Sequence, residues 1–591
     1  MRIQAIKRKK MATLWVLGIL LAMNCSAGFA DEATAQAAVA PVDSTSASTD
    51  KPQSPGAKPG AKAQPTATTP VVKQPTEPEA NFDLLELRVK GNTMLEDTVI
   101  ERTVYPYLGL KKNIDTVESA RSGLEDAYHN KGYQTVVVDI PEQDVENGVV
   151  TLQVIEGKVS QLRVTDSRYF SLGKIKAGVP ELAEGKVPNM PVMQKQLEVL
   201  SAQSEDRAIT PILRAGDTPG TLEVDLKVKD ELPLHGRIEL NGRNTSATSR
   251  LRLVNSLHYD NLWQKMHSGS LMYQVSPENS EEVDVWAGTY AMPIPETDAK
   301  LAIYAVSSSS KAQVAQVGGT TVIGIGEIYG LRLIKPLPGF DDYSHSLTIG
   351  VDYKNFKEDT KSGNEPLRHT PISYLPFMVQ YSSSIFDKAW QASLTLGVNF
   401  GIRGLVSDSN TYGKNELGKP VIVGEFEDKR HGARPNYAYL SAEASFSHDL
   451  PYEMQFVSRF AGQVADSPLI SNEQFSLGGM DSVRGYFETQ ALADDGITAS
   501  LELKSPRLLP ISIDYVNKLQ ALAFVDGGFG RLQQPRGSEP ENYSLLSTGV
   551  GVRFQVWKYF QGVLDLGFPL LTLDPVKAGH PKLHFSIATD F

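Results

Sequence analysis

The sequence predicts a mainly β protein in which a C-terminal transmembrane antiparallel β-barrel is preceded by two small α+β domains. The first observation is an alternation of apolar and polar residues, with a period of two, which fills residues 231–591. The second is an order of helix and strand patterns that occurs twice in succession between residues 81 and 230. The third is an export segment at residues 1–30, which directs the chain out of the cytoplasm.

Residues 1–30 have the layout of a secretory signal peptide. Basic residues precede an apolar run from Met11 to Met23, and small residues close the segment at Ala30. The run of about 13 residues is short of the roughly 20 that a transmembrane helix needs, so we expect cleavage and not an anchor. The only cysteine, Cys25, lies inside this segment, so we expect a mature chain without disulfides or a catalytic thiol.

Residues 31–80 consist mainly of Ala, Pro, Thr, Ser, Gln and Lys, with few large aliphatic side chains. Such a segment cannot bury enough apolar area to offset the entropy of ordering it. We therefore expect a disordered linker between the signal peptide and the first folded domain.

The two α+β domains are predicted at residues 81–156 and 157–230. Each shows a strand, two helices and two further strands in the same order. In the first domain the second helix ends near Tyr128, and Gly132 suits its left-handed C-terminal cap. Tyr133 then opens a strand that we expect to continue for about eight residues, to position 140.

The region 231–591 alternates apolar and polar side chains over stretches long enough to cross a membrane. The apolar face of one such stretch consists of Ala392, Leu394, Leu396, Val398 and Phe400. A soluble sandwich alternates too, but strands of about 9 to 11 residues with aromatic ends, such as Tyr259 and Trp263, favour an outer-membrane barrel. The length fits sixteen strands of about ten residues, with fourteen or eighteen as alternatives.

A long connection is predicted at residues 466–496, and it contains the run Val483, Arg484, Gly485 and Tyr486. A glycine pair precedes the run by a few residues, which indicates tight turns. Taken alone, this run describes a turn with an exposed arginine. A role for it depends on a partner elsewhere in the barrel.

That partner is predicted on the barrel wall. In the strand pattern of residues 519–526, Phe524 and Asp526 lie on the polar face, so Asp526 should point into the lumen. Gly528 leaves room there for a loop backbone to approach. The planar fork of Arg484 suits bidentate binding of a carboxylate, and the alternative is an aspartate solvated by water in the lumen.

With these features in this order, residues 82–591 resemble the transporters of two-partner secretion, the TpsB family of haemolysin and filamentous-haemagglutinin secretion proteins. The two α+β domains resemble tandem POTRA domains, whose pattern the spacing of Tyr128, Gly132 and Tyr133 matches. The resemblance implies that the motif loop folds into the lumen, where Arg484 meets Asp526. Some members carry an N-terminal helix that plugs the barrel, but residues 31–80 show no amphipathic stripe.

The same resemblance implies a bacterial outer-membrane exporter whose POTRA domains lie in the periplasm and capture an unfolded secreted passenger of haemolysin or adhesin type. Its other implied partners are outer-membrane lipid and, during biogenesis, the barrel-assembly machinery. The terminal Phe591, which ends an alternating strand, resembles the signal that this machinery reads. The alternatives are an assembly or insertion factor of the same superfamily, which should carry more POTRA domains, and a passive porin.

Composition and motifs exclude several other classes. The net charge of −11 argues against a nucleic-acid partner. No Gly-Lys-Ser/Thr loop offers a nucleotide site, and the ten histidines show no metal-ligand spacing. We therefore expect no enzyme activity, no cofactor, no metal and no nucleotide.

Overall fold

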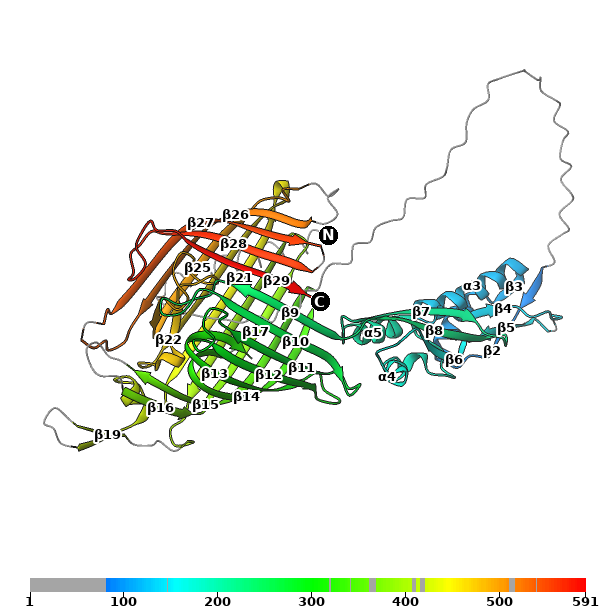
Figure 1. Cartoon of the computed structure of the whole chain (residues 1–591). Coiled ribbons are helices and arrows are strands. Elements are labelled where there is room, and N and C mark those ends of the chain that lie inside the picture. The colour runs from blue at the N-terminus through cyan, green and yellow to red at the C-terminus, as the bar shows by residue number, and fades with distance from the viewer. Residues whose placement is uncertain are drawn as a thin grey trace, which may run out of the picture. The chain divides into compact units, whose positions relative to one another are not determined.

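The computed structural model describes residues 81–591 except 146, 318–319, 341, 361–367, 407–410, 415–419, 510–515, 538 and 558. The predicted signal peptide and linker lie outside the described residues. The chain divides into two compact units, and their described parts are residues 81–232 and Pro233–Phe591 (Figure 1).

The first unit begins with a module of two helices and short strands. Its elements are β1 (Phe82–Leu84), β2 (Glu86–Lys90), α2 (Asp97–Val104), η1 (Tyr105–Tyr107), β3 (Gly109–Lys112), α3 (Ile114–Asn130), β4 (Val137–Asp139) and β5 (Val149–Ile155). The main sheet has the order β2-β5-β4, with β2 parallel and β4 antiparallel to β5. The strand expected from Tyr133 is shorter than predicted, because Val136 donates its N–H to the Tyr133 carbonyl and residues 133–136 form a turn.

Helix α3 packs on this sheet through one apolar face, formed by Val117, Ala120, Leu124 and Tyr128. The side chain of Asn113 caps its first turn by accepting a hydrogen bond from the Thr116 N–H. Tyr128 is fully buried, and its hydroxyl donates to Asn92 Oδ1 at 2.6 Å. Burial raises the pKa of Tyr128, and the nearby Glu156 raises it further, so the phenol stays a hydrogen-bond donor.

A second module repeats this topology. Its elements are β6 (Lys158–Thr165), α4 (Leu172–Ala177), η2 (Pro180–Leu182), α5 (Met190–Ser201), β7 (Arg207–Ala215) and β8 (Thr221–Asp230). The sheet order is β6-β8-β7, again with one parallel and one antiparallel pair. The twofold repeat that the sequence predicts is therefore present in the backbone.

Gly132 joins the two modules as well as ending α3. Its φ of +97° lies in the left-handed region that favours glycine. Its carbonyl accepts a hydrogen bond from the Met190 N–H at 2.9 Å, and the Asn189 amide donates to the Lys131 carbonyl at 2.8 Å. Asn189 also caps α5 by accepting a hydrogen bond from the Val192 N–H, so the end of α3 is fixed against the start of α5.

The second unit is a closed barrel. Its strands are β9 (Leu234–Asn241), β10 (Arg252–Leu262), β11 (His267–Val275), β12 (Asp284–Pro293), β13 (Lys300–Val317), β14 (Thr320–Phe340), β15 (Tyr343–Thr360), β16 (Arg368–Tyr374), β17 (Pro376–Phe386), β18 (Trp390–Gly401), β21 (Ala438–Leu450), β22 (Met454–Ala465), β25 (Asp495–Lys504), β26 (Val516–Arg531), β27 (Asn542–Val556), β28 (Phe560–Pro569) and β29 (Lys582–Asp590). Both β16 and β17 pair with β15 in one register, so they form one strand interrupted at Leu375. The described residues thus form sixteen antiparallel barrel strands, and the predicted fold class is confirmed.

The two faces of each barrel strand differ as the alternation predicts. On β26, Val525 is 49% exposed on the outer face, whereas its neighbour Asp526 is fully buried on the inner face. The outer face is apolar, as a wall in contact with lipid requires. No helix in the described part of the chain is long and apolar enough to cross a membrane.

The barrel closes by pairing its last strand with its first, and this pairing shows which barrel end holds the chain terminus. Strand β29 pairs with β9, and in Figure 1 the red strand labelled β29 lies beside the green strand labelled β9. Gly236 and Phe591 exchange two backbone hydrogen bonds of 2.8 and 2.9 Å, so the chain terminus lies where β9 begins. Because neighbouring strands run in opposite directions, the connections after β18 and β22 lie at the barrel end opposite to Phe591.

Replacing Gly132 by alanine should destabilise the unit of residues 81–232. A Cβ at this position would lie 2.8 Å from the Asn189 amide atoms and 2.9 Å from Cδ of Pro191. A left-handed backbone costs a non-glycine residue about 1–2 kcal/mol, and the clash adds to this. We expect the thermal transition of this unit, followed by circular dichroism of the full-length protein, to fall by roughly 2–8 °C.

The matched control is Gly173→Ala in α4, because a Cβ there meets no atom within 4 Å. A transition temperature that falls equally in both variants would contradict the assignment of Gly132 to the junction between the modules.

Candidate functional site

The connection between β22 and β25 is folded back against the inner wall of the barrel. It contains η4 (Ser471–Glu473) and a small hairpin formed by β23 (Phe475–Leu477) and β24 (Ala491–Ala493). Gly478 and Gly479, with φ of +96° and +116°, turn the chain at the end of β23. Beyond this turn Val483 and Tyr486 are fully buried, and they pack with Leu477 and Leu545. This packing brings the motif of residues 483–486 to the wall.

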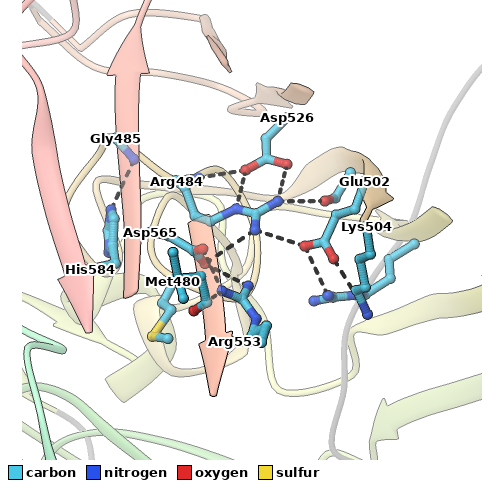
Figure 2. A network of polar contacts seen from close by, with 12 residues as sticks. Met480, Arg484, Gly485, Glu502, Lys504, Asp526, Arg553, Asp565 and His584 are labelled. Carbon is cyan, nitrogen blue, oxygen red and sulfur yellow. Dashed lines mark hydrogen bonds and ion pairs between the residues drawn. The ribbon is translucent and has the colours of Figure 1, made fainter. Parts of the chain in front are cut away.

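Arg484 lies at the centre of a buried polar cluster (Figure 2). Its Nε donates to Asp526 Oδ2 at 2.7 Å, and its Nη2 donates to Asp526 Oδ1 at 2.8 Å, so the pair is bidentate. The backbone N–H of Arg484 also donates to Asp526 Oδ2, at 3.1 Å. The structure therefore brings together the two residues that the sequence analysis singled out.

Two further carboxylates share the same guanidinium. Arg484 Nη1 donates to Glu502 Oε1 at 2.7 Å and to Asp565 Oδ2 at 3.2 Å. Glu502, Asp526 and Asp565 lie on β25, β26 and β28, and their side chains are at most 1% exposed. Three strands of the wall thus converge on one side chain of the connection.

The charges of this cluster are close to balanced. Arg553 donates to both oxygens of Asp565, at 2.5 and 2.8 Å, and Arg459 Nη2 donates to Glu502 Oε1 at 3.1 Å. Lys504 Nζ lies 3.9 Å from Glu502 Oε2, so three carboxylates face three guanidinium groups and one ammonium group. A buried charge without a partner is strongly unfavourable, so removal of one member typically costs about 3–5 kcal/mol.

The ring of Phe524 covers the guanidinium from one side. The Cζ atom of Arg484 lies 3.5 Å from the centroid of this ring, which is a close cation–π contact. Phe524 itself lies over Gly549, where a Cβ would come within 2.3 Å of the ring. Arg484 thus has carboxylates in its plane and an aromatic ring on its face, an arrangement that a lysine cannot reproduce.

The residues beside Arg484 fix the backbone of the motif. Gly485 has a φ of +94°, and its N–H donates to His584 Nε2 at 2.9 Å, so this imidazole nitrogen is an acceptor. The Tyr486 hydroxyl lies 2.8 Å from the Leu571 carbonyl. At Gly528 a Cβ would lie 3.0 Å from Val483 Cγ2, so the glycine allows close approach of the loop.

Sequence reasoning missed Glu502, Asp565 and His584. Each occupies an inward position on a strand, which is a weak signal because many lumen residues are polar. The other predicted residues lie elsewhere: Tyr128, Gly132 and Tyr133 belong to the first unit, and Phe591 lies at the end of β29.

Comparison with known proteins agrees with this architecture. Residues 220–554 match the family described as haemolysin secretion/activation protein ShlB/FhaC/HecB, and residues 82–157 match the POTRA domain of ShlB type. The chain is similar to the outer membrane transporter CdiB of Escherichia coli O6:K15:H31 (strain 536 / UPEC), with 24% identity over an alignment of 524 residues that covers 86% of this chain and 82% of CdiB. It is also similar to the heme/hemopexin transporter protein HuxB of Haemophilus influenzae (strain 86-028NP), with 21% identity over an alignment of 500 residues that covers 80% of this chain and 81% of HuxB.

The solved structure of CdiB from Escherichia coli shares this fold. It matches with a TM-score of 0.54 and 20% identity, over 88% of this chain and 93% of the CdiB chain. Because the family match spans more than half of the sequence, the protein belongs to the ShlB/FhaC/HecB family of haemolysin secretion/activation proteins.

Proposed function

We propose that this protein is the outer-membrane transporter of a two-partner secretion system and exports one secreted partner protein through its barrel. The observation that carries the proposal is the Arg484 cluster, which fixes a long connection inside the barrel of a ShlB/FhaC/HecB family member. The barrel lies in the bacterial outer membrane, and the POTRA region lies in the periplasm. The related CdiB and HuxB are both named as transporters.

In this proposal the two modules capture the unfolded partner, a haemolysin or an adhesin, before it enters the barrel. Strands β4 and β7 are edge strands of their sheets. An extended segment can bind at such an edge through main-chain hydrogen bonds, while side-chain pockets select its sequence. The segment then passes through the lumen in an extended form, and binding and folding outside the cell supply the free energy.

The Arg484 cluster then acts as the anchor of a gate. The connection of residues 466–494 occupies lumen space next to β25, β26 and β28 that a passing chain would need. Export therefore requires this connection to shift or to leave. An anchor made of ion pairs suits that purpose, because each pair can form again after the chain has passed.

Two alternatives fit less well. An assembly or insertion factor of the same superfamily should carry more POTRA domains than the two modules described. A passive porin needs neither these modules nor an anchored connection. The match to secretion proteins favours export over both.

Deleting the gene should remove one large, β-rich protein from the culture medium, and mass spectrometry of the medium measures this. A chain that lacks residues 82–230 should restore a heat-modifiable barrel in the outer membrane without restoring the secreted protein, because capture is lost. Unchanged secretion in the deletion strain would exclude the transport proposal, and full secretion by the truncated chain would exclude capture by the modules.

Arg484→Lys and Asp526→Ala should each lower secretion by about tenfold or more while the barrel still assembles. The lysine keeps the charge but cannot bind Asp526 bidentately and Glu502 in the same plane, so we expect that the connection no longer returns to one position after each opening. Loss of a buried charge pair costs on the order of 2–5 kcal/mol, which is ample for this effect. Secreted partner and folded barrel are measured by immunoblot.

The matched control is Arg531→Lys, since Arg531 is more than half exposed and lies 3.6 Å from the equally exposed Glu541. Exchanging the charges of Arg484 and Asp526 should not restore secretion, because a carboxylate at position 484 would face Glu502 and Asp565. Wild-type secretion by Arg484→Lys, or recovery in the exchanged variant, would show that the shared guanidinium is not the anchor.

Phe591→Ser should lower the amount of barrel in the outer membrane several-fold, because we propose that the barrel-assembly machinery reads the terminal aromatic residue. The backbone bonds of Phe591 to Gly236 do not need the ring, so the barrel itself can still close. Membrane fractionation followed by a heat-modifiability gel measures the effect. Equal barrel levels in Phe591→Ser and wild type would argue against this signal.

A further inference from the structure

The connection between β22 and β25 carries a second buried charge that the Arg484 cluster does not use. Glu473 Oε1 accepts hydrogen bonds from Lys354 Nζ at 2.6 Å and from the Tyr374 hydroxyl at 2.7 Å. Glu473 Oε2 accepts from the Tyr439 hydroxyl at 3.0 Å. The side chains of Glu473 and Lys354 are only 2% and 6% exposed. These partners lie on β15, β16 and β21, a different arc of the wall from the strands that bind Arg484.

An apolar cluster that includes Tyr374, a hydrogen-bond partner of Glu473, combines the inner wall with two connections. It contains the wall residues Val285, Tyr304, Ile328, Phe356 and Ile372, the residues Phe426 and Tyr437 that precede β21, and the residues Leu469 and Ile470 that follow β22. The rings of Tyr374 and Phe426 meet edge to face at 5.5 Å. The lumen of a membrane barrel is usually polar and filled with water. We infer from this apolar cluster that the two connections exclude water from one side of the lumen.

The two connections are also bonded to each other. Helix α6 (Glu425–Lys429) lies in the connection before β21, and Arg430 follows it directly. Arg430 donates to Asp494 Oδ2 at 2.7 Å and to the Leu469 carbonyl at 2.5 Å. Asp494 is fully buried, and its Oδ2 also accepts from the Gln533 N–H at 2.7 Å. Movement of residues 466–473 would therefore disturb both connections.

We propose that Glu473 is a positioning residue that, with Lys354, pins the connection of residues 466–494 to a second arc of the wall and keeps the outer mouth of the lumen closed. The polarity is the reverse of that in the Arg484 cluster, since here the connection supplies the anion and the wall supplies the cation. The connection lies at the barrel end opposite to Phe591. The POTRA region joins the barrel at the start of β9, beside Phe591, so the opposite end is the outer mouth. This proposal rests on the proposed function in one respect, namely that the secreted partner is what passes through the mouth.

A cysteine at position 470 reports whether the mouth is closed. Ile470 is 1% exposed within the apolar cluster, and Cys25, the only natural cysteine, is replaced by serine. In intact cells a membrane-impermeant maleimide should label Ile470→Cys slowly. Adding Glu473→Gln or Lys354→Met should speed labelling by about tenfold or more, because each removes the ion pair that opposes local opening.

The matched control is Glu239→Gln. Glu239 is a lumen carboxylate whose bonded partners all belong to β9 and β29; they are Arg237, Asn241 and Ser586. This variant should leave the labelling rate unchanged. Folding of every variant is checked by heat-modifiable migration, and Lys354→Met removes the same contact from the wall if Glu473→Gln does not assemble.

Planar bilayer recordings of the purified protein give a second measurement, in which both variants should open more often than wild type. Slow labelling and wild-type opening in Glu473→Gln and Lys354→Met, or an equal increase in Glu239→Gln, would overturn the proposal. Neither measurement uses the secreted partner. If the secretion assays contradict the transport proposal, the labelling and bilayer results still test the role of Glu473. If the labelling and bilayer results contradict the role of Glu473, the transport proposal still stands.

Discussion

One interaction, the bidentate pair between Arg484 and Asp526, holds the motif of residues 483–486 against the barrel wall. Three hydrogen bonds join these two residues, and Glu502 and Asp565 bind the remaining edge of the guanidinium. Because these acceptors come from separate strands, the side chain can satisfy all of them only at one height and one angle in the lumen. The turns at Gly478 and Gly479 serve to deliver the arginine to that place.

The wall is shaped to receive the loop as much as it is charged to hold it. Gly528 and Gly567 face the motif, and a Cβ at Gly567 would come within 2.6 Å of the Gly485 nitrogen. Side chains at these two positions would keep the backbone of the motif away from the carboxylates. Charge and close approach therefore depend on each other, and neither alone would fix the connection.

The fold was more predictable from sequence than the site. Alternation at positions such as Val525 and Asp526 reports directly which face meets lipid. The strand number is less directly encoded, because the length fits sixteen strands but also allows fourteen or eighteen, and the structure shows sixteen. The pairing of Arg484 with Asp526 rested on motifs, because alternation says that a residue points inward but not what it meets. Glu502, Asp565 and Glu473 could not be predicted, since their partners depend on strand register and on the path of a connection. The strand expected from Tyr133 was too long because a local turn competes with the sheet.

The use of ion pairs as anchors follows from the difference between a dry and a wet lumen. A buried ion pair adds little net stability over well-packed apolar groups, because desolvation offsets most of the attraction. Its value here lies in how it is released. While water is excluded the charges attract strongly, but once water reaches them each charge is hydrated and the pair is worth at most about 1 kcal/mol. An apolar anchor would instead expose its surface to water on release and resist opening throughout. Two ion-paired anchors of reversed polarity, at Arg484 and Glu473, can therefore hold the connection firmly when the lumen is closed and release it readily when it opens.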